Sequence, residues 1–304
     1  MEIDLLVAIG GGSVVDAGKA VSAMLPLEGS VRDYLEGVGT KTHTGMKKYF
    51  IAMPTTSGTG SEATANAVLS ETGVNGYKRS LRHENLVPDV AIIDPELTLG
   101  CPPEITAASG MDAFTQLMES YLSTHSNPVT DALSLEGICK VHACIVRAVI
   151  AGDDIEARSG MAYAALLSGI TLSNAGLGLI HGFASSVGGC FNVPHGVICG
   201  TMMGIVNRYT IEMLLQQNSI SATHEKYGLL GKLLSGKEGK DIPWYMQFVS
   251  DYIDNLTDIL HIQHLGKFGV LEADLDRIAD STDHKANPVK FEKWQLVKML
   301  RARL

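Results

Sequence analysis

The sequence predicts an α/β N-terminal domain followed by an all-helical C-terminal domain. Before Leu99, short apolar runs that end at glycine- or proline-containing turns alternate with a helical segment, which is typical of a parallel sheet with helical crossovers. After Cys101-Pro102-Pro103 only helical patterns follow. A chain of 304 residues exceeds what one core usually holds. We therefore expect two domains, residues 1–98 and 99–304.

The α/β elements are expected in the order strand, helix, strand, strand. Residues 3–9 form a short continuous apolar run, which is typical of a buried parallel strand. A helix over 14–24 follows, with Ser13 as its N-cap. Further strands are expected over 49–53 and 90–93.

The helices of the second part have clear starting signals. Asn127-Pro128 combines a capping residue with a proline at the first helical position, so a helix should begin there and end near Gly152. Other helices are expected over 156–172, 197–209 and 273–280, and a last one from near Phe291.

Composition excludes several partners. A hydrophobic fraction of 45% and a charged fraction of 19% describe an ordinary soluble globular protein. The net charge of −9 argues against nucleic acid and against an anionic membrane. No run reaches the roughly 18 apolar residues of a membrane span. Five cysteines without a CxxC motif favour a reducing cytoplasm.

Two glycine-containing turns could receive a cofactor. Gly10-Gly11-Gly12-Ser13 lies between a strand and a helix, where a pyrophosphate can approach backbone amides at the positive end of the helix dipole. It lacks the G-x-G-x-x-G pattern, and a tight turn that needs glycine explains it equally well. The segment from Thr55 to Ser61 follows another strand and offers hydroxyl groups. Together the two turns favour a bound dinucleotide.

Asp112 and Gln116 lie four residues apart on a predicted helix and hence on one face. They share a polar stripe with Glu119, opposite an apolar one. A solvated helix face explains this spacing at least as well as a binding site does.

His181 and His195 lie within Ser159–Asn207, a segment without Asp, Glu, Lys or Arg. An unpaired buried imidazole costs about 1–3 kcal/mol, so each needs a hydrogen-bond partner or a metal. Core histidines bonded to backbone carbonyls are one reading. The other joins both to Asp112 around Zn²⁺ or Fe²⁺ with an open position for a substrate oxygen. The remaining histidines are expected at the surface: His43, His83, His125, His142, His224, His261, His264 and His284.

The ordered motifs of the chain resemble those of the iron-containing (group III) alcohol dehydrogenases, which share a fold with glycerol dehydrogenase and dehydroquinate synthase. The resemblance runs essentially end to end through the following segments: Gly10 to Ser13 with Asp16, Pro54 to Glu62, Asp94-Pro95, Gly110 to Ala113, Gly176 to Gly178 with His181, Pro194-His195-Gly196 and Asn287-Pro288. It implies a dinucleotide-binding domain and a helical domain, with metal and substrate in the cleft between them.

The resemblance also implies roles for single residues. The metal ligands carry over to Asp112, His181 and His195, with Gln116 where iron-dependent members usually have histidine. A glutamine oxygen is a neutral and weaker ligand, so three strong ligands remain, as in the zinc-dependent glycerol dehydrogenases. The expected metal is therefore Fe²⁺ or Zn²⁺. Ser185 stands where many members have another histidine near the nicotinamide. NAD or NADP contacts carry over to Gly11, Gly12, Ser13, Asp16, Thr55, Thr56, Thr59 and Lys78, and the substrate pocket to Leu172 and Asp283.

The implied activity is that of a metal-dependent NAD(P)-linked alcohol dehydrogenase or aldehyde reductase acting on a small alcohol or aldehyde. A homodimer or higher homo-oligomer is expected. The chain begins at the phosphate-turn strand, whereas family members have earlier strands, so a truncated member is expected. The alternatives are a glycerol-dehydrogenase-like enzyme, a dehydroquinate-synthase-like lyase, which would need a basic phosphate-binding cluster in the helical domain, and a non-catalytic metal-binding remnant.

Overall fold

A βαβ unit opens the chain. The computed structural model describes residues 3–71 and 77–304. Strand β1 (Leu5–Gly10) leads through helix α1 (Gly12–Met24) to strand β2 (Tyr49–Pro54), which pairs with β1 in parallel. Strand β5 (Val90–Ala91) pairs with the other edge of β2, giving the sheet order β1-β2-β5. The predicted strands and the first helix are thereby confirmed.

Two local expectations in this unit were wrong. The N-cap of α1 is Gly11, and Ser13 lies inside the helix. Strand β1 is also not fully buried, because Leu5, Val7 and Ile9 are 49%, 48% and 57% exposed. The reason is that β1 is an edge strand and that α1 packs on only one face of it.

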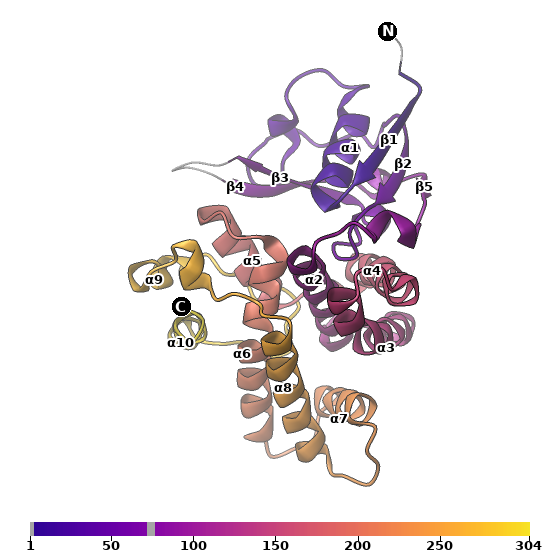
Figure 1. Cartoon of the computed structure of the whole chain (residues 1–304). Helices are drawn as coiled ribbons and strands as arrows, with labels where there is room; N and C mark the ends of the chain where they lie inside the picture. Colours follow the sequence, from indigo (N-terminus) through magenta and orange to yellow (C-terminus); the bar gives the residue numbers. More distant parts are fainter. Residues whose placement is uncertain (1–2, 72–76) are drawn as a thin grey trace.

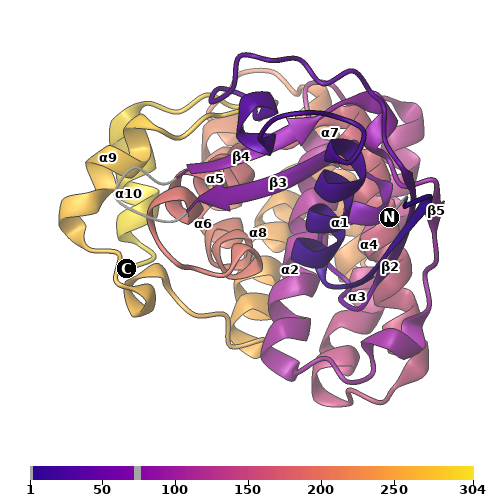
Figure 2. The ribbon, with the colours of Figure 1, turned by 90° about the horizontal axis from the view of Figure 1, so that it is seen from above.

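An antiparallel hairpin that the sequence did not indicate lies beside α1. It consists of β3 (Asn66–Glu71) and β4 (Tyr77–Arg82). In the view from above, the hairpin extends from α1 across the ends of α5 and α6 (Figure 2). This placement puts one face of the hairpin opposite the helical part of the molecule.

A buried lysine ties α1 to the hairpin. Lys19 is only 1% exposed, and its Nζ donates to the Ser61 carbonyl oxygen at 2.8 Å and to Thr64 Oγ1 at 2.9 Å. Its neighbour Asp16 accepts a hydrogen bond from the Val68 amide at 3.1 Å and another from the Ser61 hydroxyl. Since Lys19 Nζ also lies 3.3 Å from Asp16 Oδ1, the two side chains fix the hairpin relative to the helix.

The rest of the chain is helical and forms the larger part of the molecule (Figure 1). Its helices are α2 (Pro103–Leu122), α3 (Pro128–Ile150), α4 (Ile155–Ala175), α5 (Leu179–Cys190), α6 (His195–Leu215), α7 (Ala222–Ser235), α8 (Ile242–Ile259), α9 (Leu275–Asp280) and α10 (Lys293–Arg301). All predicted helices are present. The expected domain boundary at 98/99 falls at the end of a 3-10 turn, Pro95–Thr98, ahead of α2.

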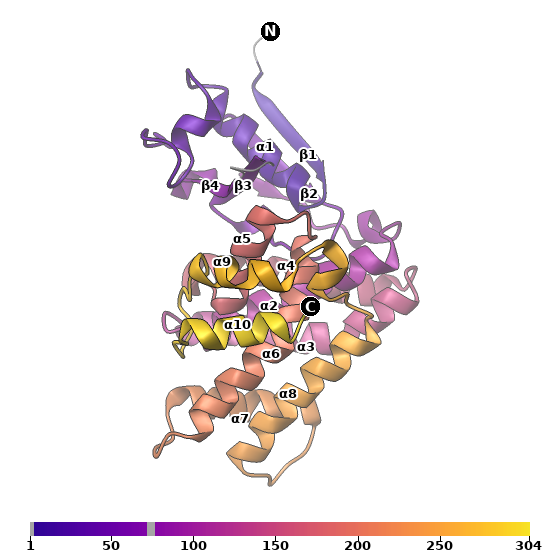
Figure 3. The ribbon, with the colours of Figure 1, turned by 90° about the vertical axis from the view of Figure 1, so that its left-hand side faces the viewer.

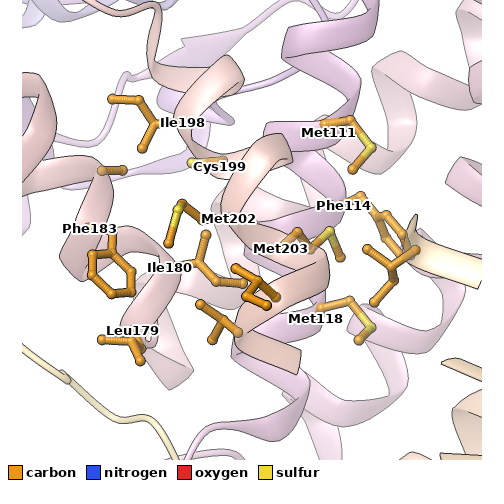
Figure 4. Packing of buried hydrophobic residues seen from close by; sticks show 14 of the residues in the cluster. Met111, Phe114, Met118, Leu179, Ile180, Phe183, Ile198, Cys199, Met202 and Met203 are labelled. Carbon is orange, nitrogen blue, oxygen red and sulfur yellow. The ribbon is translucent and has the colours of Figure 1, made fainter. Parts of the chain in front are cut away.

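The largest hydrophobic core lies within the helical part. Helix α6 packs between α2 and α5, and its Met202 and Met203 fill the space between them (Figure 4). Helices α9 and α10 lie along one side, against α5 and α6 respectively (Figure 3). The helix α3 begins as predicted, because the Asn127 side chain accepts from the amides of Val129 and Thr130.

Within the described ranges 3–71 and 77–304, no single helix has the length and apolar character needed to cross a membrane. The bent pair Ile155–Ala175 and Leu179–Cys190 reaches that limit only jointly, by length and composition, with an angle of 99° between its members.

Candidate metal and cofactor site

The polar stripe of α2 is buried. Asp112, Gln116 and Glu119 are 2%, 3% and 6% exposed, because α2 is surrounded by α3, α4 and α6. The reading of this stripe as a solvated helix face was therefore wrong. A buried polar or charged side chain needs a partner, so each of these three side chains should contact a hydrogen-bonding group or an ion.

Asp112 meets the histidine pair. Its Oδ1 lies 3.4 Å from His181 Nε2 and 3.7 Å from His195 Nε2. Among the described residues this buried oxygen has no hydrogen-bond partner. Burial acts to raise the pKa of Asp112, but the imidazoles of His195 and His181 outweigh it and lower that pKa to about 2. Asp112 is thus a carboxylate with an unsatisfied oxygen directed at two ring nitrogens.

His181 is oriented by Glu119. The Nδ1 of His181 lies 2.6 Å from Glu119 Oε2, and Glu119 Oε1 accepts from the Ile180 amide at 2.6 Å. A carboxylate beside Nδ1 keeps a proton on that nitrogen, so Nε2, which faces Asp112, is the nitrogen left to bind a cation. Glu119 was not among the predicted site residues.

His195 is the first residue of α6, and its side chain is 31% exposed. Its Nδ1 lies 3.4 Å from Lys78 Nζ of strand β4. Enclosure by protein lowers the pKa of His195 to about 3, although Asp112 opposes this shift. The ring is therefore neutral near pH 7 and has a nitrogen lone pair available.

A fourth potential ligand, Cys199, lies one helical turn after His195. The donor atoms of Asp112, His181, His195 and Cys199 all lie within 4.8 Å of one another. Cys199 Sγ is 3.8 Å from Nε2 of each histidine. Burial raises the pKa of its thiol to about 12. Cys199 was not among the predicted site residues. Its spacing of four residues from His195 would have placed both on one face of a helix.

Gln116 is held by a neighbouring serine. Its Oε1 lies 2.6 Å from Ser168 Oγ on α4, and the same hydroxyl is 2.7 Å from the Ala165 carbonyl oxygen. The amide thus has a protein partner, in contrast to Asp112 Oδ1.

These donors fit a divalent metal. A carboxylate and two imidazoles are the ligand types that Zn²⁺ and Fe²⁺ accept, and the unsatisfied Asp112 Oδ1 is what an absent cation would leave behind. His181 and His195 do not fit the alternative of core histidines bonded to backbone carbonyls. Their ring nitrogens contact side chains instead.

The cluster opens into a cavity of about 490 Å³ between the α/β and helical parts. Its α/β wall consists of Gly12, Ser13, Asp16, Thr59, Ser61, Thr64, Asn66, Val68, Ser70, Lys78, Ser80 and Arg82. Its helical wall consists of Asp112, Gln116, Leu172, Gly176, Leu177, His181, Ser185, His195 and Lys285.

Five of the eight predicted cofactor residues line this cavity: Gly12, Ser13, Asp16, Thr59 and Lys78. Thr55 and Thr56 are not among its lining residues; the Thr55 amide donates to the Gly10 carbonyl oxygen at 2.9 Å. Gly11 is the N-cap residue of α1 and is also not among the lining residues. A Cβ added at Gly12 would lie 2.5 Å from Thr59 Cγ2, so glycine at this position allows the close approach of α1 to the Thr59 side chain.

The two predicted substrate-pocket residues differ. Leu172 lines the cavity, as does Ser185. Asp283 is exposed and absent from the lining; its Oδ1 accepts from the Lys285 amide at 2.9 Å, closing a turn. The structure thus gives no support for Asp283 as a pocket residue.

Two histidines expected at the surface are buried. His43 Nε2 lies 3.1 Å from the Ala23 carbonyl oxygen, and His224 Nε2 lies 2.9 Å from that of Leu214. Both are core histidines satisfied by backbone carbonyls, so the expectation was wrong for these two.

Fold and site together define a class of protein: a dinucleotide-binding α/β unit that faces a helical metal-binding unit across a cleft. Family models described as "Iron-containing alcohol dehydrogenase" and "Fe-containing alcohol dehydrogenase family, C-terminal" match residues 1–95 and 106–304. The chain belongs to the iron-containing alcohol dehydrogenase family, and it is a metal-dependent alcohol or aldehyde oxidoreductase.

Named relatives agree with this assignment. A 1,3-propanediol dehydrogenase of Klebsiella pneumoniae is 34% identical over 99% of this chain and 76% of its own length. Alcohol dehydrogenase 4 of Saccharomyces cerevisiae is 32% identical over 98% of this chain and 75% of its own. The crystal structure of a 1,3-propanediol oxidoreductase superposes with a TM-score of 0.87 at 32% identity, covering 99% and 77% of the two chains. A sulfoacetaldehyde reductase from Bifidobacterium kashiwanohense, solved with NAD⁺, gives 0.83 at 26% identity over 99% and 76%.

Proposed function

We propose that Asp112, His181 and His195 hold the catalytic divalent metal of an NAD-linked alcohol dehydrogenase or aldehyde reductase. The observation that carries this proposal is the buried, unsatisfied Asp112 Oδ1 between two imidazole nitrogens. A metal held there would supply Lewis-acid polarisation of a substrate oxygen, and a bound nicotinamide would supply the hydride chemistry.

The chain's own residues prepare this chemistry. Glu119 holds His181 with Nε2 directed inward. If His195 binds metal through Nε2, its Nδ1 carries a proton and cannot accept from Lys78. Lys78, which lines the cavity, would then be free to offer its ammonium group to a bound cofactor.

The cofactor is proposed to lie along the α/β wall. The first turn of α1 has no acidic side chain, so its amides and dipole favour the pyrophosphate. The NAD⁺ complex of the sulfoacetaldehyde reductase supports NAD, and NADP remains the alternative. Gly12, Ser13, Thr59 and Lys78 are the proposed contacts, with Asp16 as the tether behind them.

The proposed substrate is a small alcohol or aldehyde that enters beside Leu172. The names of the relatives favour this over the dehydroquinate-synthase-like alternative and leave the glycerol-dehydrogenase-like one open.

Five free thiols agree with the expected reducing cytoplasm. A homo-oligomer remains our expectation, to be tested by sedimentation.

The test is the substitution His195→Ala. We expect the purified variant to lose bound metal and dehydrogenase activity while keeping its circular dichroism spectrum. His125→Ala, which removes an exposed histidine, serves as the matched control and should retain both. Stoichiometric metal in His195→Ala, measured by elemental analysis, would reject the assignment.

A further inference from the structure

We propose that Cys199 Sγ is the fourth protein ligand of the metal centre, in place of Gln116, and that the resulting site prefers Zn²⁺ to Fe²⁺. The proposal rests on the metal site described under the proposed function and specifies its ligand set. The role of Cys199 rests on its place among three other donors, one of which has no other partner.

Helix α6 supplies two of the four donors. His195 and Cys199 are separated by one turn, so both side chains leave the helix on the same face. Figure 4 shows Cys199 at the end of α6 where that helix passes between α2 and α5, above the packed Met202. Asp112 on α2 and His181 on α5 approach from these two neighbouring helices.

The spacing of the donors matches one tetrahedral ion. With zinc bonds of about 2.0–2.1 Å to nitrogen or oxygen and about 2.3 Å to sulfur, tetrahedral ligands lie about 3.3–3.6 Å apart. The carboxylate-to-imidazole separations are 3.4 and 3.7 Å, and both sulfur-to-imidazole separations are 3.8 Å. The 3.4 Å separation lies within the tetrahedral range, the other three exceed it by a few tenths of an ångström, and the two remaining donor pairs lie within 4.8 Å, so the donors would have to draw together to close the shell.

Gln116 is the weaker candidate for the same position. Its amide is neutral and is already bonded to Ser168 at 2.6 Å. Cys199, on the neighbouring helix α6, has no such competing bond to a serine and would supply a stronger ligand at the same centre.

Charge balance also favours sulfur. The site is buried, and a divalent ion held by one carboxylate and neutral groups alone would retain a net positive charge. A thiolate from Cys199 removes that charge; the metal–sulfur bond replaces the sulfur–hydrogen bond, and the proton leaves to solvent. Thiolate is a soft ligand suited to zinc, and Fe²⁺ binds a given set of donors more weakly than Zn²⁺ does; a zinc ion held by four protein ligands would need a fifth coordination position for the substrate oxygen.

X-ray absorption spectroscopy of the zinc-loaded full chain tests this directly. We expect one sulfur neighbour at about 2.3 Å together with nitrogen and oxygen neighbours at about 2.0–2.1 Å. Zinc bound with nitrogen and oxygen neighbours only would overturn the role of Cys199 and leave the proposed function standing. A chain that binds Fe²⁺ but not Zn²⁺ would overturn this proposal alone, and a chain that binds neither metal would overturn both.

Variants assign the sulfur to its residue. The cobalt-loaded protein should show a thiolate-to-metal charge-transfer band that Cys199→Ser abolishes. Cys144→Ser, the matched change at a buried cysteine between α3 and α4, should keep the band, and so should Gln116→Ala. A band lost only in Gln116→Ala would reject the proposal. If Cys199→Ser does not fold, the absorption spectrum of the unaltered chain still decides.

Discussion

At the scale of single residues, Glu119 connects the fold to the metal site. Its carboxylate accepts from the Ile180 amide with one oxygen and from His181 Nδ1 with the other. The backbone of α5 and the imidazole ring are therefore positioned by one side chain. Partners of this kind typically change metal affinity by about 10–100-fold when they are removed.

Glu119→Gln reverses one of these bonds without changing the side-chain volume. The glutamine offers one acceptor to two donors, so its amide N–H faces either Ile180 or His181 Nδ1. In the second case the proton moves to Nε2 and blocks metal binding. We expect metal affinity to fall about 10–100-fold, measured by competition with a chelator.

The control for this change is Glu136→Gln on the exposed side of α3, where Glu136 pairs with Lys140. It should leave metal affinity unaltered. Equal affinities in the two variants would show that Glu119 serves packing alone.

At the scale of elements, two glycines allow α4 to touch the loop that precedes the hairpin. A Cβ on Gly169 would lie 2.2 Å from the Gly60 carbonyl oxygen, and Gly60 itself has φ +60°. This contact fixes the segment that contains Thr59 and Ser61 against the helical part. The crossing therefore sets the width of the cavity at its α/β wall.

Gly169→Ala should destabilise the protein although alanine is the better helix former. Propensity alone predicts a gain of about 0.5–1 kcal/mol, but the collision with backbone costs about 1–3 kcal/mol. The measurement is the denaturation midpoint. Gly189→Ala in α5, where no atom outside the local helix backbone lies within 4 Å of the added Cβ, should show the gain of about 0.5–1 kcal/mol that propensity predicts. A midpoint for Gly169→Ala at or above that of Gly189→Ala contradicts the argument.

The hairpin shows why the sequence did not predict every element. Its cavity-facing residues alternate with others along both strands: Asn66, Val68 and Ser70 on β3, and Lys78, Ser80 and Arg82 on β4. Because that face lines the cavity rather than a core, it is mostly polar and produces no apolar run. The parallel strands and helices α1, α3, α4, α6, α9 and α10 were predicted, and α2 was expected without bounds, whereas α5, α7 and α8 were not predicted although they also pack in the helical part.

The site was only partly accessible to sequence reasoning for a related reason. Motif order gave Asp112, His181 and His195, since these lie in recognisable segments. Glu119 and Cys199 lie one or two turns from such residues, and their relevance follows only once α2, α5 and α6 are packed together. Asp283, which was carried over from the resemblance alone, lies outside the cavity.

At the scale of the whole molecule, the cavity is built from both parts, so a ligand that fills it must stabilise their arrangement. A cofactor present at 100 times its dissociation constant raises the free energy of unfolding by about 2.7 kcal/mol. We therefore expect NAD⁺ at millimolar concentration to raise the melting temperature of the metal-loaded chain. The increase should grow with the logarithm of NAD⁺ concentration once the site is saturated.

Gly12→Ala tests whether this stabilisation arises at the phosphate turn. The new Cβ would collide with Thr59 Cγ2 at 2.5 Å and disturb the surface on which the pyrophosphate is proposed to lie. We expect the NAD⁺-dependent increase to shrink strongly, whereas Gly100→Ala, with no atom within 4 Å, should keep it. An unaltered chain that responds to neither NAD⁺ nor NADP⁺ is the result expected of a non-catalytic metal-binding remnant. A response that survives Gly12→Ala instead moves the cofactor to another wall of the cavity.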